Sequence, residues 1–123
     1  MNTVGWPDPE KTAEQVISHG LSNDSLVLDM GCGTGLVAAH LIHKSTVKGY
    51  TLVGIDASQQ MLDRAAARGI YQSLHKTMLC NLQSYKENFS SLEGKFDFVT
   101  ASGLLAEGHA TNEVFAEMIY SLK

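Results

Sequence analysis

Hydrophobic and polar positions follow two different periods along this chain. Residues 25–30 and 50–55 are short, almost continuous apolar runs, which are typical of parallel strands covered on both faces. The pattern instead predicts helices with an apolar face over residues 9–20, over residues 36–44 and in the stretch that follows Ser58. Strand and helix patterns that alternate in this way predict an α/β domain with a parallel sheet.

Capping signals support the boundaries of these helices. Asp8 and Pro9 form an N-cap and first-turn pair, Ser58 can cap the third helix, and Gly69 can end it. The second half of the chain is less regular. There we expect a strand over 74–80, a polar stretch through Ser91, a strand over 96–101 and a final helix that Thr111 can cap.

Composition narrows the class of protein. The 123 residues are 44% hydrophobic and 18% charged, which predicts one globular domain over residues 1–123. The formal charge is -4 with scattered basic residues, so we expect no nucleic-acid partner. The chain lacks an apolar run of about 18 residues, and acidic residues occupy its start, so we expect neither a membrane span nor a signal peptide. Cys32 and Cys80 have no CxxC partner, and together these features predict a soluble, cytoplasmic protein.

The sequence "LVLDMGCGTG" places Gly31, Gly33 and Gly35 directly after the first predicted strand. Glycine allows positive φ, and the free N–H groups of the following helix favour a ligand with a carboxylate or phosphate. Asp56 closes the next strand, where an acidic side chain can bind both hydroxyls of a ribose. An NAD site favours GxGxxG, whereas this chain has GxGxG with Asp29 two positions before the first glycine.

The motifs "LDMGCGTG" and "VGIDAS" resemble motif I and the following acidic motif of class I S-adenosylmethionine-dependent methyltransferases. The segments "SQQMLDRAAARG", "LCNLQ" and "KFDFVTASGLL" resemble later parts of that fold. Within the class, "GTGLVAAHL", "GIYQSL" and "FDFVTASGLL" are most similar to the methyltransferase-like proteins of the Williams-Beuren region type. The resemblance implies a Rossmann-like, three-layer α-β-α fold with a partial parallel sheet of strand order 3-2-1-4.

The same resemblance implies a set of cofactor-binding residues for S-adenosylmethionine and its product S-adenosylhomocysteine. Gly31 and Gly33 would lie against the methionine portion, and Asp29 would approach its ammonium group directly or through water. Asp56 would bind the ribose hydroxyls. Asn81 stands where many relatives carry aspartate, and its amide oxygen can accept the same hydrogen bond from adenine. The implied set is Asp29, Gly31, Cys32, Gly33, Asp56, Ala57, Met61, Asn81, the backbone N–H of Leu82 and the carbonyl of Ala101.

Few residues suggest catalytic chemistry, and no catalytic residue is assigned. An activated sulfonium methyl mainly requires that the nucleophile be held in line and water be excluded. The loop "ASGLLAEGHA" lacks the (N/D)PP(Y/F) signature of base and glutamine methyltransferases. Glu107 and His109 in this loop are candidates for a base or simply solvated residues. His40 and His43 are three apart on a helix without a third ligand, so we expect no metal.

Members of the class have seven strands in the order 3-2-1-4-5-7-6, of which this chain is expected to supply four. We therefore expect the N-terminal, cofactor-binding part of the domain, with an exposed edge on the fourth strand through which the chain could self-associate or bind another chain. Three functions remain open. They are methyl transfer to an unidentified small-molecule or protein acceptor, a non-catalytic S-adenosylmethionine-binding module and an NAD-dependent oxidoreductase.

Overall fold

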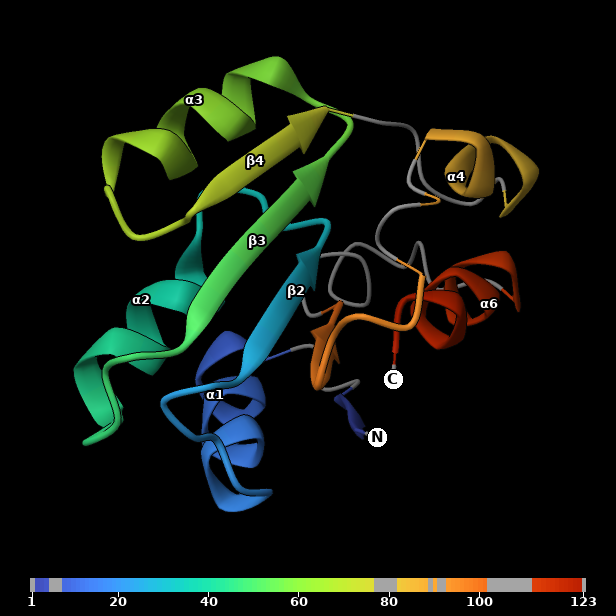
Figure 1. Cartoon of the computed structure of the whole chain (residues 1–123). Helices are drawn as coiled ribbons and strands as arrows, with labels where there is room; N and C mark the ends of the chain where they lie inside the picture. Colours follow the sequence, from blue (N-terminus) through green and yellow to red (C-terminus); the bar gives the residue numbers. More distant parts are fainter. Residues whose placement is uncertain are drawn as a thin grey trace.

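The computed structural model describes residues 2–4, 8–76, 82–88, 90, 93–101 and 112–122. Helices and strands alternate through most of this part of the chain, as the hydrophobic pattern predicts (Figure 1). In chain order the elements are β1 (Asn2–Val4), α1 (Pro9–Ser18), β2 (Leu26–Met30), α2 (Leu36–Lys44), β3 (Thr51–Asp56), α3 (Gln59–Ala67), β4 (Ser73–Lys76), α4 (Leu82–Asn88), β5 (Phe98–Thr100) and α6 (Asn112–Ser121).

The predicted caps of the first and third helices are confirmed. The Asp8 carboxylate accepts hydrogen bonds from the backbone N–H groups of Glu10 and Lys11 at the start of α1. The Ser58 hydroxyl accepts from the N–H of Met61, 3.3 Å away, at the start of α3. These side chains satisfy N–H groups that a helix leaves without an internal partner, which explains why both helices begin where they do. Thr111, the predicted cap of α6, lies outside the described residues.

The strands form one parallel sheet in the order β1-β5-β2-β3-β4. Its four strands β4, β3, β2 and β5 reproduce the predicted order 3-2-1-4. One of them, β5, is shorter than predicted and covers Phe98–Thr100. Of the strand predicted over 74–80, β4 confirms the part up to Lys76, and residues 77–80 lie outside the described part. The register places Asp29 on β2 beside Gly54 on β3 and beside Thr100 on β5.

The prediction that the fourth strand has an exposed edge is wrong. β1 pairs in parallel with β5 along its whole length, from Asn2 beside Phe98 to Val4 beside Thr100. Just before β5, the N–H of Phe96 donates to the carbonyl oxygen of Ser121, 3.0 Å away, at the end of α6. β1 and the end of α6 thus both lie on the β5 side of the sheet (Figure 1). These pairings remove the physical ground on which self-association through this strand was predicted.

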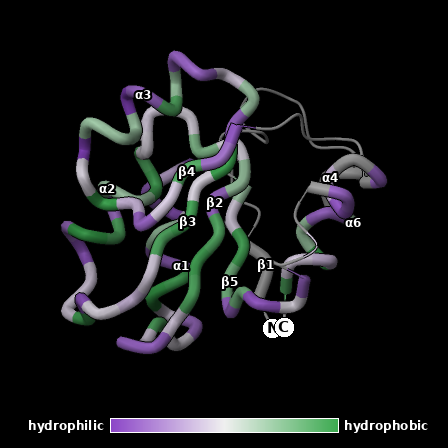
Figure 2. Tube along the Cα trace, turned by 45° about the horizontal axis from the view of Figure 1, so that its top comes forward, coloured by the Kyte–Doolittle hydropathy of each residue, from purple (hydrophilic) through white to green (hydrophobic). Residues whose placement is uncertain are grey.

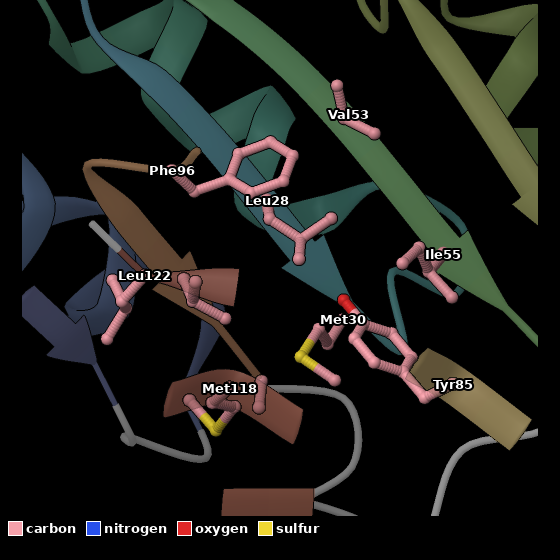
Figure 3. Close-up of a cluster of buried hydrophobic side chains, with 10 residues drawn as sticks. Leu28, Met30, Val53, Ile55, Tyr85, Phe96, Met118 and Leu122 are labelled. Atoms are coloured by element: carbon pink, nitrogen blue, oxygen red, sulfur yellow. The ribbon is translucent and has the colours of Figure 1, made fainter. Parts of the chain in front are cut away.

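Two apolar cores lie on opposite faces of the sheet, and they confirm the three-layer α-β-α arrangement. Leu28 and Met30 of β2 face α4 and α6, where Tyr85 and Met118 pack against them (Figure 3). Val27 faces the opposite side, where α1 and α2 cover the sheet. Figure 2 shows the result as hydrophobic central strands, with hydrophilic segments on the surrounding helices. Both faces of the sheet are covered, which explains why its strands read as continuous apolar runs.

Candidate cofactor site

The glycine turn leaves β2 and enters α2 at the carboxyl edge of the sheet. Gly31, Gly33 and Gly35 all have positive φ, at 65°, 57° and 88°. The N–H of Cys32 donates to the carbonyl oxygen of Ile55, 3.0 Å away, and so ties the turn to the end of β3. A Cβ placed on Gly33 would meet no atom of the described residues within 4 Å, so in this part of the chain the space beside the backbone is open. At Gly33 the turn therefore combines a conformation that favours glycine with an unobstructed backbone surface.

Asp56 connects the two sequence motifs directly. One carboxylate oxygen, Oδ2, accepts a hydrogen bond from the N–H of Gly33 at 2.9 Å. The other, Oδ1, accepts from the N–H of Ser58, also at 2.9 Å. Each oxygen of an ionised carboxylate has a further lone pair, so the group is oriented by the backbone and can still accept two hydroxyl groups. Asp56 is partly buried at the end of β3, next to the open backbone of the turn.

Asp29 is the most deeply buried carboxylate near this turn, with 1% of its surface exposed. Its Oδ1 accepts from the Thr100 hydroxyl and its Oδ2 from the Tyr71 hydroxyl, each at 2.9 Å. Burial raises the pKa of Asp29 from 3.8 to about 6; the hydrogen bonds from Thr100 and Tyr71 oppose this rise, and the charge of Asp56 adds to it. At neutral pH Asp29 is therefore mostly ionised.

Tyr71 and Thr100 are site residues that the sequence analysis missed. They lie 42 and 71 positions from Asp29, so no local pattern links them to it. One signal was present: Gly54 interrupts the apolar run of β3, and a glycine inside a strand often marks the close approach of another group. Here that group is Tyr71, whose ring lies 3.0 Å from where a Gly54 Cβ would stand.

Gly54→Ala is therefore expected to destabilise the fold by about 1–3 kcal/mol. The added Cβ would lie 2.6 Å from the end of the Leu74 side chain and 3.1 Å from the Cys32 sulfur. Urea unfolding of the variant measures this loss. The double variant Gly54→Ala/Leu74→Val is the matched control, because it shortens the nearest side chain and should recover part of the stability. A single variant as stable as the wild type would contradict this packing.

Cys32 fills space in the site and is not a reactive thiol. Its side chain is buried against Leu62 and Ala65 of α3. Burial, together with the negative charges of Asp29 and Asp56, raises the pKa of the thiol well above its usual range. The thiol form therefore predominates at neutral pH, and nucleophilic chemistry needs the thiolate.

The remaining predicted cofactor residues belong to different parts of the fold, and one of them lies outside the described residues. Ala57 is exposed and Met61 half-buried, both at the start of α3 beside Asp56. Ala101 follows β5 and is buried in the core on the α4 and α6 face. Leu82 begins α4, whereas Asn81 lies outside the described residues. The structure thus brings together Asp29, the glycine turn, Asp56 and the start of α3.

The sequence analysis also named candidate residues for other chemistry. Glu107 and His109 are outside the described residues, as is Cys80. In the part of the chain that the structure describes, no group of three or more His, Cys, Asp or Glu side chains could hold a metal ion, and His40 and His43 belong to no such group.

A surface hollow between α1 and α2 shares no residue with the glycine turn. It is lined by Glu14, Ile17, Ser18, His43 and Lys44. The Lys44 ammonium is already paired with Glu10 at 3.0 Å and with Glu14 at 3.3 Å. These ion pairs join two helices at the surface, and we interpret the hollow as part of their packing.

A methyltransferase domain family matches residues 27–123. The chain belongs to this family. The match begins inside β2, so it includes the glycine turn, Asp56 and β5, and it confirms the resemblance of these segments to methyltransferases. Human methyltransferase-like protein 27 is 39% identical over 99 residues, which cover 80% of this chain and 37% of that protein.

Solved methyltransferase structures share the fold. The TehB-like SAM-dependent methyltransferase of Corynebacterium glutamicum aligns with a TM-score of 0.64 at 18% identity, covering 93% of this chain and 56% of that one. A SAM-dependent methyltransferase of Aquifex aeolicus aligns with a TM-score of 0.64 at 20% identity, covering 94% of this chain and 58% of that one. This chain thus spans between about one third and three fifths of the length of these three relatives. None of the helices in the described ranges is long and apolar enough to cross a membrane.

Proposed function

We propose that this methyltransferase-family chain binds S-adenosylmethionine at the glycine turn and serves methyl transfer to a small-molecule or protein acceptor. The observation that carries the proposal is the Asp56 carboxylate, which two backbone N–H groups orient beside the open backbone of Gly33. Asp56 would bind the ribose hydroxyls, and the turn around Gly31, Cys32 and Gly33 would lie along the methionine portion. The bound cofactor supplies an activated methyl group on its sulfonium sulfur.

The charges of the site favour this cofactor over NAD. Asp29 is buried between two neutral hydroxyl donors and beside Asp56, and among the described residues no lysine or arginine forms an ion pair with it. A buried carboxylate is strongly stabilised by a cation, which the ammonium group of S-adenosylmethionine would provide. The pyrophosphate of NAD would instead place negative charge near both carboxylates. The residues present therefore fit S-adenosylmethionine.

Other residues are proposed for the adenine and for the ammonium group. Ala57 and Met61 lie at the start of α3, next to the carboxylate assigned to the ribose, and would pack against the adenine. Asn81 and the N–H of Leu82 would bind the polar edge of the ring, and the carbonyl of Ala101 would accept from the ammonium. Residues 1–123 would then form the cofactor-binding part of a methyltransferase domain. A cytoplasmic location stays a prediction, supported by the free, buried thiol of Cys32.

A non-catalytic S-adenosylmethionine-binding module is the second candidate. One observation favours it: the polar side chains that the structure describes at the turn hydrogen-bond to one another or to the backbone, and none of them is assigned a catalytic role. Both candidates require the same cofactor site, and methyl transfer to any acceptor would separate them.

Calorimetric titration with S-adenosylhomocysteine tests the proposed site, with NAD as the control ligand. We expect a dissociation constant on the order of micromolar for S-adenosylhomocysteine and no measurable binding of NAD. The product is used because it carries the same adenosine and amino-acid groups without the reactive sulfonium. Binding of NAD alone would replace the proposal with a nicotinamide-dependent function. Binding of neither ligand would refute a cofactor site in this chain.

A further inference from the structure

A row of neighbouring residues crosses three strands on the face covered by α1 and α2. Asp29 lies in its middle, with Thr100 beside it on β5 and Gly54 beside it on β3. Tyr71 comes from the segment between α3 and β4 and passes over Gly54, where the absence of a side chain leaves room for its ring. Its hydroxyl then reaches Asp29 Oδ2 at 2.9 Å.

The two hydroxyl groups have complementary roles. Each carries one proton, and both protons are donated to Asp29, one to each carboxylate oxygen. Thr100 is fully buried on the strand, so its position is set by the sheet. Tyr71 stands outside the sheet, and its ring passes over Gly54 to place its hydroxyl at Asp29. Such donors stabilise the ionised form of a carboxylate against the cost of burial.

We propose that Tyr71 is a positioning residue that orients the Asp29 carboxylate and, with Thr100, favours its ionised form for the ammonium end of the cofactor. This inference rests on the proposed function, because it assigns the ammonium group to Asp29. The inference adds to the cofactor site a residue outside the glycine turn. It also predicts that cofactor binding depends on pH, because the ionised Asp29 carboxylate is the form that would bind the ammonium group.

The charged and titratable groups that act on this carboxylate come from four segments. Asp56 at the end of β3 repels its charge, while Cys32 in the glycine turn stays a neutral thiol. Tyr71 itself stays protonated, because burial and the charge of Asp29 raise its pKa well above the usual range. Arg68 at the end of α3 acts on Tyr71 in the opposite direction. Tyr71 is therefore a donor throughout the range in which Asp29 titrates.

Affinity for S-adenosylhomocysteine should fall as the pH falls, because the ionised Asp29 carboxylate is the form that would bind the ammonium group. With a pKa of about 6, the Asp29 carboxyl group is mostly ionised at pH 7 and mostly protonated at pH 5. The dissociation constant for S-adenosylhomocysteine should therefore rise about tenfold from pH 7 to pH 5. Loss of the Tyr71 donor should raise the midpoint of this dependence.

Tyr71→Phe tests the proposal by calorimetry with S-adenosylhomocysteine from about pH 5 to pH 8. The midpoint of binding is expected to move up by about one pH unit, with affinity at pH 8 close to that of the wild type. Tyr50→Phe is the matched control: its hydroxyl is buried on the same face and has no hydrogen-bond partner among the described residues. An NMR titration of the Asp29 carboxyl carbon in the ligand-free variants should show the same shift for Tyr71→Phe alone.

The outcomes separate this inference from the proposed function. If Tyr71→Phe binds with the wild-type midpoint, the role of Tyr71 is refuted while the cofactor site stands. An equal shift in Tyr50→Phe would also refute it, because any buried hydroxyl would then have the same effect. If the wild type does not bind S-adenosylhomocysteine at any pH, the proposed function fails, and this inference fails with it.

Discussion

Asp56→Ala is expected to weaken the binding of S-adenosylhomocysteine by about 100-fold or more. The variant removes the acceptor of two proposed hydrogen bonds from the ribose, and hydrogen bonds to a charged group contribute about 1.5–3 kcal/mol each. It also leaves the N–H groups of Gly33 and Ser58 without the acceptor that now orients the turn. Calorimetry with S-adenosylhomocysteine measures the loss of affinity, and urea unfolding of the same variant shows whether the fold is retained.

Asp63→Ala is the matched control for this prediction. Asp63 lies on the same helix that follows Asp56, is exposed, and accepts a hydrogen bond from the Gln59 side chain. The control removes the same charge and side chain away from the turn, so its affinity should equal that of the wild type. Unchanged affinity in a folded Asp56→Ala protein would overturn the placement of the ribose.

Asp29→Asn is expected to have opposite effects on stability and on binding. A buried carboxyl whose pKa is raised from 3.8 to about 6 binds its proton more tightly in the folded state. Folding stability is then lost as pH rises between these two values, by about 3 kcal/mol in total. Asparagine carries no charge, so the variant should be more stable than the wild type by up to about 3 kcal/mol at pH 8 and similar to it near pH 4. Urea unfolding at both pH values measures the difference.

Asp24→Asn is the control for this stability change. It removes the same charge from an exposed position, where burial has no effect on the carboxylate. Its stability should follow that of the wild type at both pH values. If Asp29→Asn were less stable than the wild type at pH 8, the ionised carboxylate would be a net stabiliser of the fold, and our account of its burial would be wrong.

Binding of methylthioadenosine distinguishes the proposed role of Asp29 from that of Asp56. It retains adenine and ribose but lacks the amino-acid end. Asp29→Asn should therefore weaken S-adenosylhomocysteine by about tenfold or more and leave methylthioadenosine unaffected, because only the ammonium contact is lost. Asp56→Ala should weaken both ligands, since both carry the ribose. Equal losses for both ligands in Asp29→Asn would place Asp29 away from the ammonium group.

Local patterns were sufficient for the first half of the sheet. The strands β2 and β3 are continuous apolar runs, α1 and α3 carry side-chain caps, and each strand is joined to the next by a helix. Parallel strands linked in this way have right-handed crossovers, which limits the sheet to few orders. The order 3-2-1-4 itself came from the resemblance of the glycine and acidic motifs to class I methyltransferases, and the observed pairings agree with it. The second half was less well predicted, because β5 has only three residues and the sequence there carries weaker periodicity.

The pairing of β1 could not be predicted, because a strand of three residues has no period to detect. What the sequence by itself determined is the set of elements, the bare turn and the acid that follows the second strand, since these depend on neighbours a few positions apart. Only the tertiary structure decided that β1 covers β5 and that Tyr71 and Thr100 both donate to Asp29. Contacts between residues 42 and 71 positions apart depend on how strands align and on which side chain fills the space at Gly54. The glycine indicates a close approach, but no local pattern identifies the residue that makes it.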